Sequence, residues 1–213
     1  MIRKLQAIAV SILFLSVLVS PSKISANTWT PGVSEGDYFT YEMYGIYTSN
    51  HPNMTLTVPI FEQNITEWVR INITSVSGSI VNQIYTLHLV DGSEVFFSFL
   101  TDVNPNNQDL FKISEKGVPI CSAKLKAGDQ IPTAELILNQ TLQKIFACGL
   151  RETNHASWHM SYDWGNIYFD RETGMLVELE RTHVFVNPVT GAKVEKTDII
   201  KLLDTNRWQI TAA

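Results

Sequence analysis

Apolar and polar residues alternate with a period of two along most of the chain, and short turn-forming segments interrupt the alternation. Successive side chains of a β-strand point to opposite faces, so this pattern predicts half-buried strands. In Glu67–Val76, for example, Val69, Ile71 and Ile73 fall on one face and Asn72 falls on the other. The strands predicted from such alternation are Gly36–Tyr47, Glu67–Val76, Ile80–Val90, Glu94–Leu100, Asn166–Asp170, Met175–Val186 and Lys193–Asp204.

Three segments between these strands have the composition of tight turns. Asp91-Gly92-Ser93 separates two apolar runs, which is a strong signal for a β-hairpin. Arg171–Gly174 carries a glycine in its last position, and Asn187–Gly191 contains Asn, Pro and Gly. In the first of these two, Asp170 is expected to accept bonds from backbone donors, and Gly174 to take a positive φ. This hairpin is favoured over a calcium loop, which needs more oxygen ligands in a longer frame.

One segment breaks the alternation with a helical spacing. In Ala134–Phe146, the apolar residues Leu138, Leu142, Ile145 and Phe146 would share one face of an α-helix. The chain is therefore expected to be mainly β with an α+β character. Its fold would be a meander forming a curved antiparallel sheet or half-barrel, with one or two helices covering a face.

The segment His155–Trp164 holds the residues most suggestive of metal chemistry. On a helix, His155, His159 and Asp163 would lie on one face as a metal trio. However, polar and apolar residues alternate throughout the segment, which predicts a strand instead. On a strand the two histidines are about 13 Å apart, too far to share one zinc ion. We therefore expect no metal site, and a hydrolase built on these three residues is the least favoured function.

The first residues have the organisation of an export signal. Arg3 and Lys4 precede the uncharged apolar run Leu5–Ser20, and Met1–Ala26 ends in a small residue suited to cleavage. We expect a signal peptide over 1–26 and one exported β-rich domain over 27–213. The alternative is an uncleaved membrane anchor, although the run is shorter than the roughly 20 residues that span a bilayer. The expected location is extracytoplasmic, either secreted or at the cell surface.

The charge of the chain restricts its partners. The formal net charge is −5, and loss of the basic residues of the signal segment would make the domain more acidic. Such a protein repels nucleic acid and anionic membrane surfaces. We expect no nucleic-acid partner, and a membrane association only through an uncleaved signal. A surface protein, a glycan and a lipid all remain possible partners.

Two further features fit an oxidising exterior. In an exported chain, Cys121 and Cys148 are expected to form one disulfide, with two free thiols as the alternative. Four Asn-x-Ser/Thr sequons are candidates for glycosylation, although Asn and Thr are also common in exposed strands and turns. The sequon asparagines are Asn53, Asn64, Asn72 and Asn139.

Aromatic residues provide the remaining lead to a binding function. Most are expected to pack in the core, but they would line an apolar pocket if the concave side of a half-barrel were unfilled. The candidates for such a ligand face are Tyr41, Phe97, Trp158, Tyr162 and Trp164. No nucleophile elbow, phosphate-binding glycine loop or His-Glu-x-x-His motif occurs in the sequence, so no catalytic residue or cofactor is assigned.

Four short motifs resemble a family of uncharacterised archaeal exported proteins. They are the segments GVSEGDYFTY (32–41), KAGDQI (126–131), GLRETN (149–154) and YFDRETGMLVE (168–178). The last is also similar, over one hairpin, to the LolA-like half-barrel lipoprotein carriers. The resemblance implies a surface or secreted protein with no assigned activity. The favoured function is a non-enzymatic binding or scaffold domain, and the alternative is a carrier of a lipid or other apolar ligand.

Overall fold

The computed structural model describes residues 29–50, 66–104, 120–131, 136–187 and 189–209, and over these residues the protein is mainly β. Nine strands form one antiparallel sheet, and two short strands pair separately. The strands are β1 (Tyr38–Ser49), β2 (Thr66–Ser77), β3 (Ile80–Leu89), β4 (Glu94–Asp102), β5 (Gln130–Ile131), β6 (Leu136–Ile137), β7 (Gln140–Phe146), β8 (Gly149–Met160), β9 (Asp163–Asp170), β10 (Leu176–Val186) and β11 (Lys193–Thr205).

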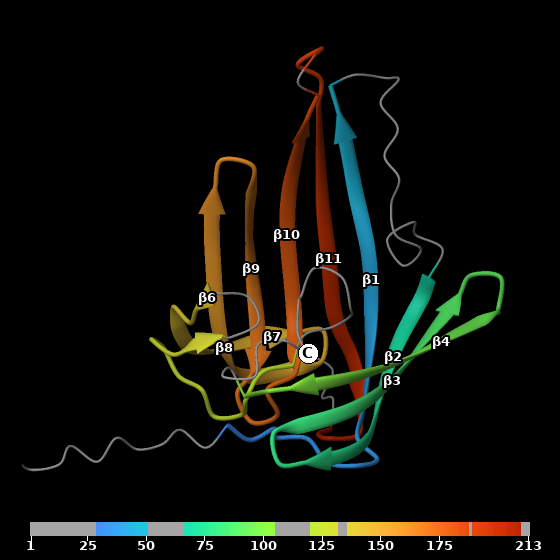
Figure 1. Ribbon diagram of the computed structural model, residues 1–213, viewed down its shortest axis with the longest axis vertical. Coiled ribbons are helices and arrows are strands. Elements are labelled where there is room, and N and C mark those ends of the chain that lie inside the picture. The colour runs from blue at the N-terminus through green and yellow to red at the C-terminus, as the bar shows by residue number, and fades with distance from the viewer. Residues whose placement is uncertain (1–28, 51–65, 105–119, 132–135, 188, 210–213) are drawn as a thin grey trace, which may run out of the picture.

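The large sheet consists of two meanders joined at its middle. Strands β1 to β4 lie side by side in chain order, as do β7 to β11 (Figure 1). The join is the antiparallel pairing of β1 with β11, in which Tyr41 lies opposite Leu202 and Tyr47 opposite Lys196. The sheet therefore depends on contacts between residues near the two ends of the described chain.

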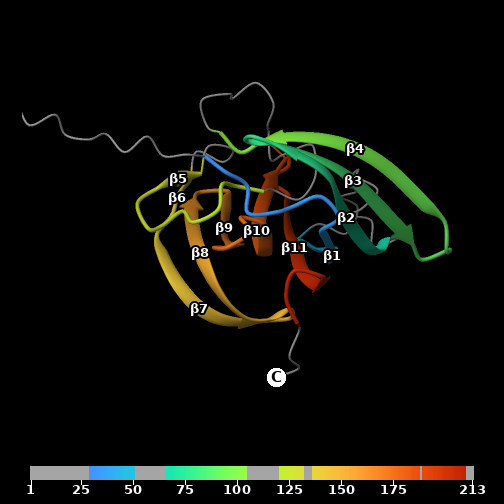
Figure 2. The same cartoon turned by 90° about the horizontal axis from the view of Figure 1, so that it is seen from below.

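The sheet is curved but open. Its edges are β4 and β7, which do not pair with each other. Viewed from below, β2 to β4 curl over one face of the central strands, and β7 with the start of β8 curls toward the opposite face (Figure 2). We call the face covered by β2 to β4 the concave face, and the opposite face the convex face. This arrangement confirms the expected mainly β, curved antiparallel sheet, which is not closed into a barrel.

The predicted turns lie where their composition placed them. Asp91-Gly92-Ser93 joins β3 to β4, and the Asp91 carboxylate accepts bonds from the backbone N–H and the hydroxyl of Ser93. Gly174, between β9 and β10, has a φ of 76°. A Cβ there would also collide with the backbone carbonyl of Cys121. Both the backbone angle and the close approach therefore favour glycine at this position.

The helix predicted over Ala134–Phe146 is wrong for the part that the structure describes. Residues 136–137 and 140–146 are the strands β6 and β7, and β7 pairs with β8 from Gln140 opposite His155 to Phe146 opposite Gly149. Ile145 and Phe146, expected on one helical face, point to opposite sides of the sheet, so that Ile145 is exposed and Phe146 is buried. Pairing with the neighbouring strand outweighs the local spacing, which is ambiguous in so short an apolar run. No helix occurs among the described residues.

A continuous hydrophobic core fills the part of the concave side that lies lower in Figure 1. Sheet residues such as Phe39, Ile71 and Phe169 are fully buried there. They pack with the segment 120–131, which bonds to the β9–β10 turn through Cys121 and Lys124 and from which Ile120 and Ile131 are also fully buried. Residues 120–131 therefore cover the face of the sheet that the predicted helix was expected to cover.

The signal segment over 1–26 lies outside the described residues. Within the described part of the chain, no helix has the length and apolarity needed to cross a bilayer.

Candidate ligand-binding site

Two neighbouring rows of residues run across five strands on the concave face, next to the core. Residues that lie opposite each other in a sheet point to the same face. The first row is Trp158, Gly165, Arg181, Asp198 and Gly45, and the second is Met160, Asp163, His183, Lys196 and Tyr47. We term these ten residues the charged rows.

The character of the concave face changes abruptly at the charged rows. The adjoining row, from β8 to β1, consists of Ala156, Ile167, Leu179, Ile200 and Met43 and is entirely apolar. Those five residues belong to the core or pack against it. Charged side chains facing inward beyond such a row are unusual for a strand face that serves only to pack the core.

Asp163 is the centre of a compact group of charged and polar side chains. Its carboxylate accepts a bond of 2.7 Å from Trp158 Nε1 and bonds from the guanidinium of Arg181, and His183 Nδ1 lies 3.3 Å away. Burial alone would raise the pKa of Asp163, but the hydrogen bonds from Arg181 and Trp158 lower the pKa below its ordinary value of 3.8. Asp163 is therefore a carboxylate that holds its neighbours in position.

A second ion pair lies beside the first. Lys196 Nζ is 2.9 Å from Asp198 Oδ1, and the two side chains are 14 % and 22 % exposed. Asp198 lies directly opposite Arg181, and Lys196 lies opposite His183. The two carboxylates of the charged rows thus balance the charges of Arg181 and Lys196.

An aromatic ring covers a glycine near each end of the first row. A Cβ on Gly165 would lie 2.8 Å from two atoms of the Trp158 indole, and a Cβ on Gly45 would lie 2.9 Å from the Tyr47 ring. Both rings can lie close over the sheet because these glycines lack side chains. Trp158 and Tyr47 are each half-buried, so part of each ring remains exposed.

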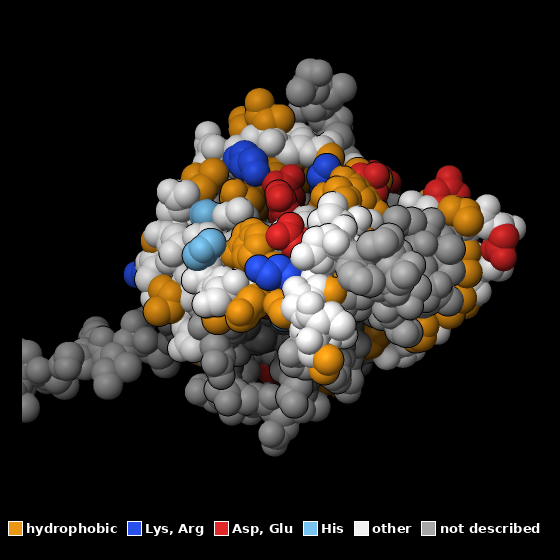
Figure 3. All heavy atoms as spheres, turned by 90° about the horizontal axis from the view of Figure 1, so that it is seen from above, with side chains coloured by type: hydrophobic (Ala, Val, Ile, Leu, Met, Phe, Trp, Pro, Cys, Tyr) orange, Lys and Arg blue, Asp and Glu red, His pale blue; other side chains and the backbone are white. Residues whose placement is uncertain are grey.

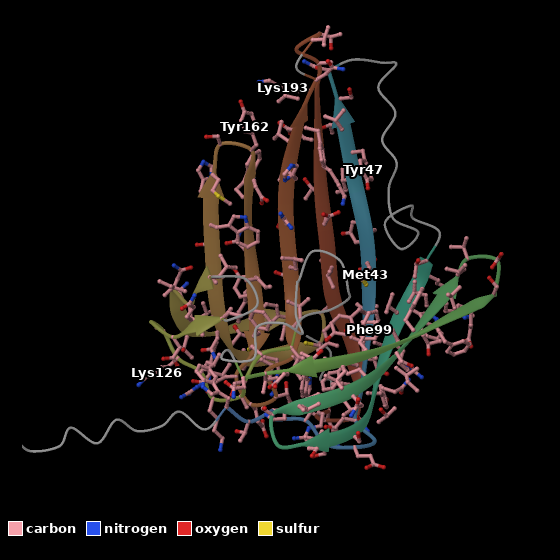
Figure 4. The ribbon with its side chains drawn as sticks, in the orientation of Figure 1. Met43, Tyr47, Phe99, Lys126, Tyr162 and Lys193 are labelled. Carbon is pink, nitrogen blue, oxygen red and sulfur yellow. The ribbon has the colours of Figure 1, made fainter. Side chains whose placement is uncertain are left out.

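The views of the molecule place these groups toward one end of the long strands. Tyr47 lies on β1 beyond Met43, toward the end where Lys193 lies, and Tyr162 marks the turn at the same end of β8 and β9 (Figure 4). Seen from that end, acidic and basic side chains are intermingled, with histidines beside them (Figure 3). The exposed end of the molecule thus carries both signs of charge.

The five aromatic residues proposed as one apolar ligand face do not lie together. Tyr41 is fully buried and donates a hydrogen bond to the carbonyl of Leu176. Phe97 is on the edge strand β4 and is half-exposed, packing near Phe99. Trp158 is the one member that belongs to the charged rows.

Trp158 and Trp164 were expected on one face, but they lie on opposite faces. The alternation over His155–Trp164 spans a hairpin, because β8 ends at Met160 and β9 begins at Asp163. Tyr162 lies in the turn and is 54 % exposed, while Trp164 lies opposite His159 on the convex face. Asp163 shares a face with Met160, as the pairing across a two-residue turn requires.

The same hairpin separates the metal trio. His155 and His159 point to the convex face, and Asp163 points to the concave face. His155 is buried, stacks on Tyr168 and has ring nitrogens near Gln140 and Asn166. Nowhere in the described chain do three His, Cys, Asp or Glu side chains form a group able to hold a metal ion.

The two cysteines are both buried and both free in the structure, so the expected disulfide is not formed there. Cys121 Sγ lies 3.5 Å from the carbonyl oxygen of Gly174. Burial raises the pKa of Cys148 to about 11, and it raises the pKa of Cys121 further still. Each thiol is therefore protonated at neutral pH and behaves as a small core residue.

Two of the four sequon asparagines are described. Asn72 is half-buried on the convex face of β2, opposite the buried face formed by Val69, Ile71 and Ile73, as expected. Asn139 is exposed just before β7, and its Oδ1 accepts a bond from the Ser157 hydroxyl. Asn53 and Asn64 lie outside the described residues. Glycosylation stays a prediction.

The four family-like motifs contribute turns and a buried ion pair, and none of their residues belongs to the charged rows. Asp37 accepts a bond from Ser34 N, and Asp129 from Lys126 N, so each closes a turn in its own motif. Asp170 accepts bonds from both the N–H and the hydroxyl of Thr173. These residues explain the motifs by folding, because an aspartate that satisfies backbone donors fixes a turn.

The third and fourth motifs also meet each other. Arg151 bonds the fully buried carboxylate of Asp170 through Nε at 2.8 Å and Nη2 at 2.7 Å. The guanidinium of Arg151 lies 3.9 Å from the Trp208 ring centroid, and Trp208 donates a bond to the carbonyl of Cys148. These contacts thus connect the β9–β10 hairpin, the β7–β8 turn and the residues after β11.

Sequence reasoning missed Arg181, His183, Lys196 and Asp198. Their spacing in the sequence could have identified them. Arg181 and His183 follow the inward-facing Leu179 at intervals of two residues, and Asp198 and Lys196 precede the inward-facing Ile200 at the same intervals. Charges in phase with the buried positions of a strand mark a polar site on its inner face.

Comparisons with known proteins give no family. No family model and no curated protein matches the chain. One solved structure is similar, that of a Bacteroides fragilis protein described as exported with a YmcC-like fold. It is 11 % identical, with a TM-score of 0.41, and the similarity covers 84 % of this chain and 99 % of that one. Similarity at this level establishes neither a shared fold nor a shared function.

Proposed function

We propose that this protein is an exported, non-enzymatic binding domain that holds a polar ligand against the charged rows. The observation that carries the proposal is the placement of Arg181, Asp198, Asp163, His183 and Lys196 on the concave face, directly beyond the apolar core. Binding sites combine apolar walls with a few precisely placed polar groups, and Trp158 and Tyr47 supply such walls here. Export rests on the signal-like segment Met1–Ala26.

A polar ligand is favoured over the lipid that a carrier would hold. The apolar part of the concave face is packed by residues of the segment 120–131, including Leu125 and Ile131, which are almost fully buried. The part beyond it carries ion pairs, whose desolvation by a lipid chain would cost several kcal/mol per ion.

Binding is also favoured over catalysis. The Asp163 carboxylate is held by Arg181 and Trp158, and its pKa lies below its ordinary value. A general acid or base needs a pKa near the working pH, which this environment opposes. The three residues of the least favoured hydrolase hypothesis, His155, His159 and Asp163, do not share one face of the sheet.

Native mass spectrometry of the protein purified from its host tests the proposal. We expect a bound small molecule whose occupancy falls at least tenfold in Arg181→Met. The matched control is Lys201→Met, because Lys201 lies on β11 but faces the convex side, opposite Glu178. Equal occupancy in both variants, or no bound molecule in any preparation, would contradict the proposal. A bound lipid would support the carrier instead.

A further inference from the structure

The charged rows have the layout of a site for a short, uncharged oligosaccharide, and we propose that such a glycan is the ligand class. This inference rests on the proposed function and names its ligand. It follows from three properties of the rows, which are the two aromatic rings, the charge balance between them, and the distance that they span.

The first property is the pair of ring-covered glycines. The indole of Trp158 lies on the backbone at Gly165, and its orientation is fixed by the 2.7 Å bond from Nε1 to Asp163. The ring of Tyr47 lies over Gly45 in the same way. A sugar ring presents a face of C–H groups, which carry partial positive charge and suit the electron-rich face of an aromatic ring. Each ring is therefore a platform on which one sugar residue can stack.

The second property is the charge balance. Asp163 pairs with Arg181, and Asp198 pairs with Lys196, so these four groups together carry no net charge. An anionic or cationic ligand would have to compete with one of these internal pairs. Sugar hydroxyls can donate to a carboxylate and accept from a guanidinium or ammonium group at once, and thus add to existing ion pairs without breaking them.

The third property is length. Gly165 on β9 and Gly45 on β1 are separated by three strand-to-strand steps, through Arg181 and Asp198. At about 4.8 Å per step the two platforms are about 14 Å apart along the sheet. This span exceeds a single sugar ring and suits two or three linked rings. The ligand would lie across the strands, with a ring on each platform and its hydroxyls over the charged residues between them.

Fluorescence titration and calorimetry with maltotriose, cellotriose, chitotriose and mannotriose test this inference, together with the matching monosaccharides. Because Trp158 is a platform, binding should shift the tryptophan emission. We expect at least one trisaccharide to bind at least tenfold more tightly than its monosaccharide. Trp158→Ala and Tyr47→Ala should each weaken binding at least tenfold. The control Trp164→Ala should leave binding unchanged, because Trp164 lies on the opposite face.

Folding of each variant is checked by circular dichroism and thermal melting. If Trp158→Ala does not fold, Trp158→Phe replaces it, since Phe keeps a platform but cannot donate to Asp163, and it should weaken binding less than tenfold. The inference is overturned if no trisaccharide binds, if Trp164→Ala weakens binding as much as the Trp158 variant, or if a sulfated analogue binds more tightly than its neutral parent. If no trisaccharide binds but Arg181→Met still lowers the occupancy of a ligand bound in the host, the glycan inference is wrong and the proposed function stands.

Discussion

Replacing Asp170 by asparagine tests whether the family-like motifs encode stability. The Asp170 side chain is completely buried, and its carboxylate accepts two bonds from Arg151 and two from Thr173. An asparagine could keep the bonds from Thr173, but its amide hydrogens would point toward the donors of Arg151. The variant therefore leaves the largely buried guanidinium with only the exposed carboxylate of Glu172, 3.6 Å away, as a counter-charge.

The expected cost is large for a change of so few atoms. Removing one partner of a buried ion pair destabilises a protein by about 3–5 kcal/mol. In a domain of this size that loss lowers the melting temperature by roughly 6–20 °C. Urea denaturation followed by tryptophan fluorescence measures it directly, and Trp208, which stacks on Arg151, lies beside the altered pair.

A neighbouring ion pair provides the control. Glu152 and Arg171 are 2.9 Å apart on the same hairpins, but both side chains are at least 40 % exposed. Exposed pairs contribute about 0–1 kcal/mol, so Glu152→Gln should change stability little. If Asp170→Asn costs no more than Glu152→Gln, the reasoning that assigns these motifs to the fold is refuted.

Three further results are expected. Iodoacetamide at pH 8 should label neither Cys121 nor Cys148 in the folded protein, and should label both after denaturation without reductant; a protein that takes no label when unfolded would instead contain the disulfide. Because the folded-state pKa of Asp163 is lowered, its carboxylate stabilises the fold above pH 3.8, and this contribution is lost as the pH falls through the lowered pKa. Asp163→Asn should therefore flatten the acid side of a stability–pH curve, and an unchanged curve would contradict this. In Gly165→Ala the new Cβ would collide with the Glu180 carbonyl oxygen and meet the Trp158 ring at 2.8 Å, so the variant should displace both and cost about 1–3 kcal/mol, seen as a shifted emission maximum and an earlier urea midpoint.

The local part of the fold was predictable because its signals are local. Alternation located most strands of the large sheet, and turn chemistry at Asp91–Ser93 and Arg171–Gly174 located two hairpins to within a few residues. The helix at 134–146 failed because its apolar spacing fits two periods, and only pairing with β8, which lies later in the chain, decides between them.

The candidate site depended on information that no single segment carries. Trp158 and Asp163 were candidate residues in the sequence. The uninterrupted alternation, however, gave no sign of the turn between them, and it placed Asp163 on the face of His155 and His159 instead of the face of Trp158. Arg181 and Asp198 come from strands of different hairpins, and they meet only because of the register between β10 and β11. Register of this kind is set by the packing of whole strands, so it cannot be predicted from the spacing of a few residues.

The pairing of β1 with β11 limits the order in which the molecule can fold. Residues opposite each other in this pair, such as Phe39 and Thr205, are separated by most of the described chain. Contacts between such distant residues slow folding, because a long loop must close before they form. During synthesis β1 is made long before β11, so the edge of β1 that pairs with β11 stays unpaired until β11 has been made. During that interval the edge can pair with another chain, so assembly of the central pair is the step most exposed to misassociation.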